Sequence, residues 1–283
     1  MRLLVTGAGG MLGQDLVHAA RAAGHDPVAL SRIQLDVTDP AAVTAAVARA
    51  QPDAIVNCAA WTDVDGAESD RGGASAVNGA GAGHVAAAAA DAGVPLVHVS
   101  TDYVFDGRAR EPYRESAPTG PLSAYGATKL EGEQAVEHAG GEHTIARSSW
   151  LFGAGGPNFV DTMLRLGGER DAVSVVTDQV GCPTFTGHLA EALVALAGAG
   201  PRGLVHVAGG GSCSWRDFAV EIFAQAGVDC RVDAATTAQM ARPAPRPAFS
   251  VLASERADAP RLPDWREGLA AYLAARAPAG ASA

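Results

Sequence analysis

The residues best suited to proton-transfer chemistry are a tyrosine and the only lysine of the chain. Lys129 follows Tyr125 by four positions, whereas the other 20 basic residues (21 Lys and Arg less one) are all arginine. A helix over 123–138 would place both side chains on one face, with the ammonium one turn from the phenol. A compact ammonium can lower the pKa of a neighbouring phenol and hydrogen-bond a ribose at once, for which a broad guanidinium fork is poorly shaped. The pair predicts a catalytic proton donor, although a surface lysine beside a half-buried tyrosine has the same spacing.

A glycine pattern near the amino terminus favours the catalytic interpretation. The apolar run 2–6 leads into Gly7, Gly10 and Gly13, spaced as G-x-x-G-x-x-G, and an apolar-periodic segment covers 11–23. This order predicts a strand, a tight turn and a helix. Such glycines let the backbone approach a pyrophosphate, and the helix amino terminus attracts its negative charge. The turn therefore predicts a dinucleotide site.

The elements that must position these residues alternate along the first 150 positions. Short apolar runs are separated by helical stretches, which is typical of a parallel sheet covered on both faces. Ligands of such sheets lie beyond the carboxyl ends of the strands, so the segments after each strand are candidates for chemistry. We expect strands at 2–6, 28–30, 54–57, 94–99 and 144–147, and helices near 11–23, 40–50, 74–92 and 123–138.

The regular alternation of predicted strands and helices ends after residue 150. A Gly- and Pro-rich break at 153–157 precedes a helix predicted at 158–166, and the further predicted elements are strands at 173–176 and 204–207 and helices at 187–198, 215–226 and 265–276. We expect residues 1–150 to form a Rossmann-like, doubly wound parallel α/β domain that binds the dinucleotide. Residues 151–283 are expected to form mainly a smaller substrate-binding lobe, with some later segments returning to the first domain. We expect the tail from Ala277 to be disordered.

A proline-rich segment at 242–247 carries Arg242 and Arg246. It has the composition of a flexible linker, but prolines also stiffen a chain. A stiff segment with two guanidinium groups is suited to clamping a phosphate. Both interpretations remain open.

Composition excludes several classes of protein. A net charge of −10 and a pI near 5.2 disfavour nucleic acid and anionic membrane as partners. The sequence contains no uncharged apolar run of membrane-spanning length and enters its first strand directly from Met1, so we expect no signal peptide and a cytoplasmic location. Four scattered cysteines without a C-x-x-C pair predict reduced, mostly structural thiols.

At this point the motifs resemble a family. The glycine turn, Ser100-Thr101 and Tyr125-x-x-x-Lys129 resemble the extended short-chain dehydrogenase/reductases. Within them, the sequence from about residue 1 to 270 closely resembles the dTDP-4-dehydrorhamnose reductases. The specific matches are the segment Asn57-x-Ala59-Ala60-x-Thr62-x-Val64-Asp65-x-Ala67-Glu68, the segment Ser100-Thr101-Asp102-Tyr103-Val104-Phe105, Trp150, the segment Asp178-Gln179-x-Gly181-x-Pro183-Thr184, and the segment Arg246-Pro247-x-x-Ser250-x-Leu252.

The resemblance implies a reaction and the residues that perform it. The implied reaction is NADPH-dependent reduction of the 4-keto group of dTDP-4-dehydro-β-L-rhamnose to dTDP-L-rhamnose. Tyr125 would donate the proton, Lys129 would hold the nicotinamide ribose, and Thr101 would hydrogen-bond the carbonyl oxygen. The residues implied to bind the dTDP-sugar are Thr101, Asp102, Tyr103, Trp150 and Arg246. Trp150 as a buried core indole and Thr101 as a strand-end cap are the structural alternatives.

The implied cofactor site extends beyond the glycines. Besides Tyr125 and Lys129, it comprises Gly7, Gly10, Met11, Leu12, Gly13, Ser31, Arg32, Asp36, Val37, Ala59, Ala60, Trp61 and Thr62. An acidic residue after the second strand would hold the ribose 2′-OH of NADH, but Ser31 and Arg32 stand there and suit a 2′-phosphate. We therefore expect NADPH to be preferred, with NADH possible. Asp36 as a turn cap, Trp61 as a packing residue and Arg32 as a solvated charge are the alternatives.

Some members of the family use magnesium bound by acidic residues at a dimer interface. Gly187 stands at one of the aligned positions, although Asp15 remains. We therefore expect no metal site, no magnesium requirement and a monomer rather than a dimer.

Three other functions share this pattern. A related dTDP-4-keto-6-deoxyhexose reductase of antibiotic-sugar synthesis would look nearly the same, because no motif fixes the C4 stereochemistry. An epimerase or dehydratase would retain NAD and add acid/base residues, whereas Ser100-Thr101-Asp102 lacks the Asp-Glu pair of the dehydratases. A regulatory subunit of methionine adenosyltransferase shares the fold without catalysis.

Overall fold

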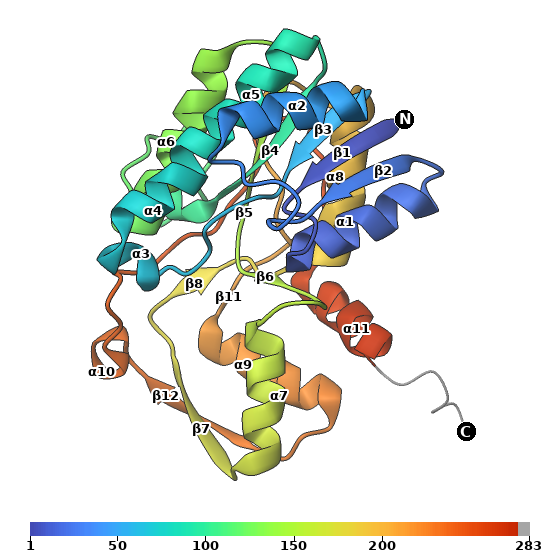
Figure 1. Cartoon of the computed structure of the whole chain (residues 1–283). Helices are drawn as coiled ribbons and strands as arrows, with labels where there is room; N and C mark the ends of the chain where they lie inside the picture. The colour runs from blue at the N-terminus through green and yellow to red at the C-terminus, as the bar shows by residue number, and fades with distance from the viewer. Residues whose placement is uncertain (277–283) are drawn as a thin grey trace.

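Six parallel strands form the central sheet of the computed structural model, which describes residues 1–276. The expectation for the tail from Ala277 lies outside the described residues. The strand order is β10-β5-β4-β3-β1-β2, so β2 lies on one side of β1, and β3, β4, β5 and β10 follow one another on the other side (Figure 1). The strands are β1 (Arg2–Thr6), β2 (Asp26–Leu30), β3 (Ala54–Asn57), β4 (Leu96–Thr101), β5 (His143–Ser148) and β10 (Gly203–His206).

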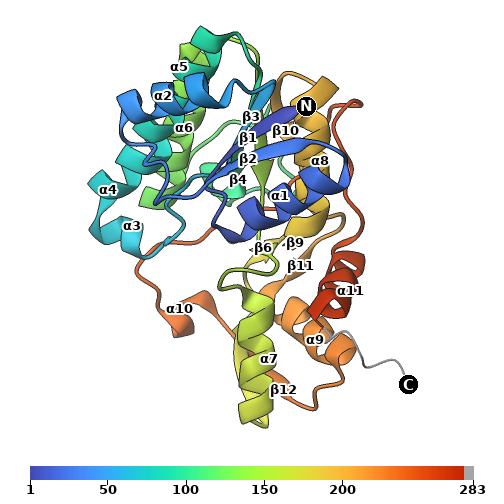
Figure 2. The same ribbon diagram turned by 45° about the vertical axis from the view of Figure 1, so that its right-hand side comes forward.

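Helices cover both faces of this sheet (Figures 1 and 2). On one face lie α2 (Pro40–Ala50), α5 (Gly81–Ala92) and α6 (Ala124–Ala139), and on the other lie α1 (Met11–Ala22) and α8 (Thr186–Ala199). The alternation of β1 explains the two layers: Leu3 and Val5 pack with α1 and α8, whereas Leu4 packs with α2 and α5. All three side chains are fully buried. The predicted doubly wound α/β fold is confirmed.

The helical segment after β3 is longer than the sequence predicts. A helix is expected at 74–92, but α4 (Arg71–Ser75), a π-helical turn η1 (Ala76–Ala80) and α5 follow one another directly. The short helix α3 (Gly66–Ser69) precedes them. π-Turns are rare and concentrate at functional sites.

A second core forms below the sheet in the view of Figure 1. It packs α7 (Phe159–Glu169), α9 (Trp215–Ala226) and α11 (Trp265–Arg276) around buried aromatic rings such as Phe152, Phe218 and Trp265. The longer strands here, β7 (Ala172–Val176) and β12 (Arg231–Ala235), pair in parallel. The remaining short elements are η2 (Asp102–Val104), β6 (Leu151–Phe152), β8 (Val180–Gly181), β9 (Thr184–Phe185), β11 (Cys213–Ser214) and α10 (Thr237–Met240).

The chain crosses between the two cores more than once. After β9 it returns as α8, which packs on α1, and then as β10, which pairs with β5. The division at residue 150 stays a prediction, with α8 covering the sheet of the first half and β10 extending it. No helix within residues 1–276 has the length and apolar character needed to cross a membrane.

Candidate active site

The glycine turn closes tightly between β1 and α1. Gly7 has a φ of 66°, and a Cβ added there would lie 2.6 Å from the backbone nitrogen of Ala59. A Cβ on Gly13 would lie 2.7 Å from the Cα of Ala8. Gly10 caps α1 without a side chain, which leaves the first-turn N–H groups around Met11 and Leu12 available to an anion. These five predicted residues, Gly7, Gly10, Met11, Leu12 and Gly13, therefore form one cradle, in which positions 7 and 13 have no room for a side chain.

The residues after β2 are arranged around a turn. The Ser31 hydroxyl donates to Oε1 of Gln34 at 2.8 Å. Arg32 is exposed, and no acidic partner lies within ion-pair distance among the described residues. The guanidinium is free to meet a ligand phosphate, whereas the Ser31 proton is already donated within the turn.

Asp36 and Val37 follow on the same side. Asp36 Oδ1 accepts hydrogen bonds from the backbone N–H of Thr38 at 3.0 Å and from its hydroxyl at 2.8 Å, which lowers the pKa of the Asp36 carboxyl. The carboxylate therefore caps a turn, as the structural alternative expects. Val37 is buried, and its carbonyl accepts a hydrogen bond from Nδ1 of His84. Contact of this pair with an adenine stays a prediction.

The loop after β3 carries Ala59, Ala60, Trp61 and Thr62, and it is held by a residue that sequence reasoning missed. Asn78 lies in the π-turn η1 and is 1 % exposed. Its Oδ1 accepts from the Trp61 backbone N–H at 2.9 Å, and its Nδ2 donates to the Trp61 carbonyl and to the Thr128 hydroxyl. One side chain thus ties the predicted cofactor loop to the helix that bears Tyr125 and Lys129. No local pattern in the sequence marks Asn78.

The three predicted catalytic residues meet at the carboxyl end of β4. Thr101 is the last residue of that strand, and Tyr125 lies in the first turn of α6, which the Ser123 hydroxyl caps by accepting from the Gly126 N–H. The ring of Tyr125 packs edge to face on Tyr103 with centroids 5.7 Å apart. Burial next to Gly126 is tight, because a Cβ there would overlap the Tyr103 carbonyl oxygen.

Lys129 lies one helical turn further and is 2 % exposed. Its Nζ donates to the Val99 carbonyl oxygen at 2.7 Å. Burial lowers the pKa of Lys129 to about 8, although the Glu133 carboxylate opposes the shift. The surface-lysine alternative is therefore wrong.

The expected lowering of the phenol pKa by Lys129 is not observed. Burial raises the pKa of Tyr125 to about 12, with the Thr101 hydroxyl opposing the shift. The physical reason is that the Lys129 ammonium is directed at a backbone carbonyl and removal from water dominates the phenol. Tyr125 is thus protonated over the whole neutral range, as a proton donor must be before reaction.

A buried ion pair supports this helix from behind. Glu133 accepts from Arg147 on β5 through two hydrogen bonds, Nε to Oε1 at 2.8 Å and Nη2 to Oε2 at 2.6 Å. The Ser100 hydroxyl also donates to Oε1. Sequence reasoning missed the pair, although Glu133 continues the i, i+4 spacing of Tyr125 and Lys129 along one face of the helix.

Trp150 has a strained backbone and a stacked indole. Its φ is 48°, and its ring lies on that of Trp215 with centroids 3.6 Å apart and planes 5° apart. Gly181 leaves room for the indole, since a Cβ there would lie 2.6 Å from Nε1. The side chain is half-buried rather than a core indole. Contact with a sugar or nucleotide stays a prediction.

Arg246 is held by a carboxylate that the sequence did not assign to it. Asp65 accepts from its Nη1 and Nη2, each at 3.0 Å, and from the Ala244 backbone N–H. Three residues later, Glu68 Oε1 accepts from the backbone N–H of Ala124, the first residue of α6, at 2.7 Å. The helix α3 therefore connects the segment 242–247 to the helix that carries Tyr125.

Comparisons with known proteins agree with this geometry. The model of the family described as RmlD substrate binding domain matches residues 1–277. The chain belongs to this family.

It is 48 % identical over 278 residues to a dTDP-4-dehydrorhamnose reductase from Streptomyces griseus, and the match covers 95 % of this chain and 91 % of the relative. It is 45 % identical over 268 residues to a dTDP-4-keto-6-deoxy-D-glucose reductase from Streptomyces niveus, which covers 94 % and 90 %. The crystal structure of a dTDP-4-dehydrorhamnose reductase from Bacillus anthracis in complex with NADP superposes with a TM-score of 0.94 at 38 % identity, covering 97 % of this chain and 99 % of that one.

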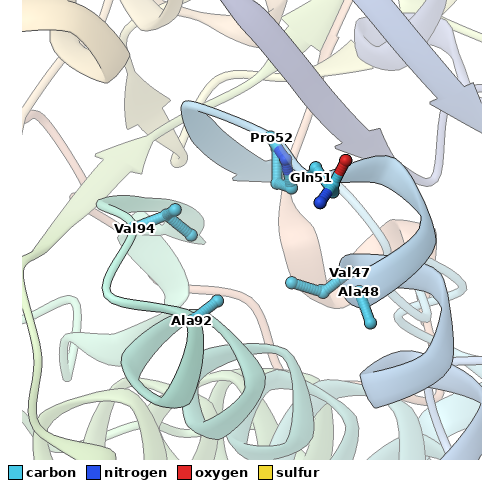
Figure 3. Close-up of a pocket in the computed structure, with 6 residues that line it drawn as sticks. All are labelled: Val47, Ala48, Gln51, Pro52, Ala92 and Val94. Atoms are coloured by element: carbon cyan, nitrogen blue, oxygen red, sulfur yellow. The ribbon is translucent and has the colours of Figure 1, made fainter.

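One hollow on the surface of this RmlD-family chain lies far from the predicted site residues. A depression of about 340 Å³ lies between the carboxyl-terminal ends of α2 and α5, where Val47, Gln51 and Val94 are among the lining residues (Figure 3). These residues precede β3 and β4, so the hollow is at the amino ends of the strands. None of the predicted site residues lines it.

Within residues 1–276, no three His, Cys, Asp or Glu side chains gather closely enough to hold a metal ion. Asp15 accepts a hydrogen bond from the Thr186 hydroxyl, beside Gly187. Independence from magnesium stays a prediction.

Proposed function

We propose that this protein reduces the 4-keto group of dTDP-4-dehydro-β-L-rhamnose to dTDP-L-rhamnose with NADPH. The observation that carries the proposal is the meeting of Thr101, Tyr125 and Lys129 at the carboxyl end of β4, beside the glycine cradle, in a member of this family. The names of the relatives and the NADP complex of a structural neighbour support the same reaction.

The cradle fits a dinucleotide, because Gly10 leaves the first N–H groups of α1 without a side-chain cap, while Gly7 and Gly13 let β1, α1 and the Ala59 loop pack closely around them. When bound there, NADPH supplies the hydride for the C4 carbonyl carbon. The N–H groups at the start of α1 would hold the pyrophosphate, and Lys129 would hold the nicotinamide ribose. Arg32 would contact the 2′-phosphate.

The protein supplies the proton and the charge stabilisation. Negative charge develops on the C4 oxygen of the substrate as the carbon is reduced. Thr101 donates a hydrogen bond to this oxygen, and Tyr125 transfers its phenol proton to it. Thr101 is buried and Tyr125 is half-buried, which limits the access of water and strengthens each interaction. We assign substrate contacts to Asp102, Tyr103, Trp150 and Arg246.

A second candidate is the reduction of a different dTDP-4-keto-6-deoxyhexose. The 45 % identity to the Streptomyces niveus reductase is close to the 48 % identity to the Streptomyces griseus enzyme. The catalytic residues are common to both reactions, so the choice depends on how the sugar is seated near Trp150.

The deciding experiment is turnover of a panel of dTDP-4-keto-6-deoxyhexoses, followed by NADPH absorbance and by NMR of the product. The proposal expects dTDP-L-rhamnose as the product of the best substrate. A better substrate with another configuration would establish the second candidate. Cofactor retained through purification together with epimerised product, or capture of a methionine adenosyltransferase without turnover, would overturn both.

We also propose that the protein acts as a monomer without magnesium. Gly187 removes an acidic side chain that a magnesium-linked interface of the family would use. The small-molecule partners are then the dTDP-sugar and the cofactor. The acidic composition supports the absence of nucleic-acid and membrane partners.

A further inference from the structure

Asp102 lies immediately behind Thr101 and is 1 % exposed. The Thr101 hydroxyl is 3.0 Å from Oδ1 of Asp102. The other carboxyl oxygen, Oδ2, is buried and has no hydrogen bond of good geometry among residues 1–276, although the Ser250 hydroxyl lies beside the carboxyl and favours its ionised form. A carboxylate in such a place is costly, because it has lost water and gained only part of the hydrogen bonding that it needs.

The titratable neighbours of Asp102 do not supply a positive charge. They are Tyr103 on η2, Tyr125 on α6 and Cys182 between β8 and β9. All three are neutral acids whose own pKa values are raised by burial. Nothing in this group favours the ionised form of Asp102.

The hydrogen bonds around Thr101 decide which acceptor receives its single hydroxyl proton. A hydroxyl has one O–H donor and two acceptor lone pairs. The backbone N–H of Tyr103 donates to Thr101 Oγ1 at 3.2 Å and fills one lone pair. If Asp102 is ionised, its Oδ1 takes the only Thr101 proton, and no proton is left for a substrate oxygen. If Asp102 is neutral, it can donate to the second lone pair, and the Thr101 O–H then turns outward, to the side where the Tyr125 phenol also lies within its reach.

We propose that Asp102 is a positioning residue: its neutral carboxyl donates to Thr101 and directs the Thr101 hydroxyl at the substrate carbonyl, whereas its carboxylate captures that hydroxyl. This inference rests on the proposed function, because it gives Thr101 the carbonyl oxygen of the substrate as its acceptor. The protonation state of the buried Asp102 carboxyl then decides whether the Thr101 hydroxyl donates to the substrate or to Asp102.

Burial raises the pKa of Asp102 to about 7, against the hydrogen bonds that favour its ionised form. The outward-directed hydroxyl is therefore present below this pKa and is lost as the pH rises through it. Lys129 loses its own proton with a pKa of about 8. In the wild-type enzyme, Asp102 is thus the first of the two groups to limit the rate as the pH rises.

The test is the pH profile of kcat/KM for Asp102→Asn. An asparagine amide donates to Thr101 at every pH and cannot ionise. Asp102 is also assigned a substrate contact, so the readout is the shape of the profile and not its height. We expect the alkaline limb to be displaced upward by about one unit, from the Asp102 pKa of about 7 to the Lys129 pKa of about 8. The matched control is Asp106→Asn, four positions along, where hydrogen bonds from Tyr113 and Arg108 hold the carboxyl pKa low. This control should keep the wild-type profile.

Two further measurements separate positioning from a structural role. In a Thr101→Val background, the substitution at Asp102 should no longer move the alkaline limb, because the hydroxyl that it directs is absent. Infrared spectra of the unliganded enzyme, taken as wild type minus Asp102→Asn, should contain the carbonyl band of a neutral carboxylic acid below pH 7 and lose it above.

An unshifted alkaline limb, an equal loss of activity at every pH, or no neutral-acid band would overturn the inference. The infrared result does not depend on substrate. A neutral Asp102 in an enzyme that turns over none of the proposed sugars would therefore count against the proposed function and not against the state of the carboxyl.

Discussion

Replacing Lys129 by arginine tests whether the ammonium has a specific role or only supplies positive charge. The lysine is 2 % exposed, and its Nζ already donates to the Val99 carbonyl at 2.7 Å. A guanidinium is longer, planar and broader, so it must displace the phenol, the cofactor ribose or the backbone of β4.

Two magnitudes follow. An error of ~1 Å at the reacting atoms can cost ~10² in rate, so we expect kcat/KM to fall at least ~100-fold, or ~2.7 kcal/mol of transition-state stabilisation. Inserting extra atoms into a filled site costs ~1–3 kcal/mol of folding stability. Taking ~2–4 °C per kcal/mol for a chain of this size class, the melting temperature should fall by ~2–12 °C.

The assay is NADPH oxidation with the best sugar of the panel, well below the onset of unfolding, with melting followed by circular dichroism. Lys129→Met is unbranched, slightly shorter and uncharged, and it separates overpacking from loss of the ammonium. Arg165→Lys changes an exposed cation in the lobe and should alter neither quantity. If Lys129→Arg keeps more than half of the wild-type kcat/KM, the role assigned to this lysine is wrong.

Three other predictions concern the proton, the cofactor and the metal. Tyr125→Phe removes the phenol proton and keeps the ring that packs on Tyr103, so kcat should fall by ~10²–10⁴ in a protein with an unchanged melting curve; turnover within a few-fold of wild type would transfer the role elsewhere. Arg32→Ala should raise the KM for NADPH and leave that for NADH nearly unchanged in parallel titrations, and equal losses would contradict a 2′-phosphate contact. Addition of EDTA should change neither activity nor the mass from light scattering, whereas a dimer that dissociates on chelation would show that metal ligands exist.

The strands and helices of the first 150 residues could be predicted because each is local and strongly patterned. The run 2–6 and the helix from Met11 are separated only by the glycine turn, whose tight geometry needs those glycines. The i, i+4 spacing on one helix predicts that Tyr125 and Lys129 lie together, and the edge at which parallel strands end predicts the place of Thr101. That the pair meets Thr101 is implied by the resemblance to the family.

The residues that support this site were not predictable in the same way. Asn78 reaches Trp61 and Thr128 from a π-turn, and Arg147 reaches Glu133 from another strand. Such contacts join residues far apart in the sequence and depend on side-chain geometry. The pKa of Tyr125 was mispredicted for a related reason, since the degree of burial is a property of the assembled core.

The helix α3 constrains how the two halves of this protein can be recombined. Asp65, which precedes this helix, holds Arg246, and Glu68 within it holds the first N–H of α6. A lobe taken from a relative with different sugar selectivity would bring its own residues in place of 242–247. Asp65 would then lose the partner that it has in Arg246. The Glu68 contact at Ala124 lies on the same four-residue turn, so the mismatch would reach the helix of Tyr125. Exchange of substrate specificity by lobe grafting should therefore transfer 63–69 together with the lobe, although these residues belong to the other half of the chain.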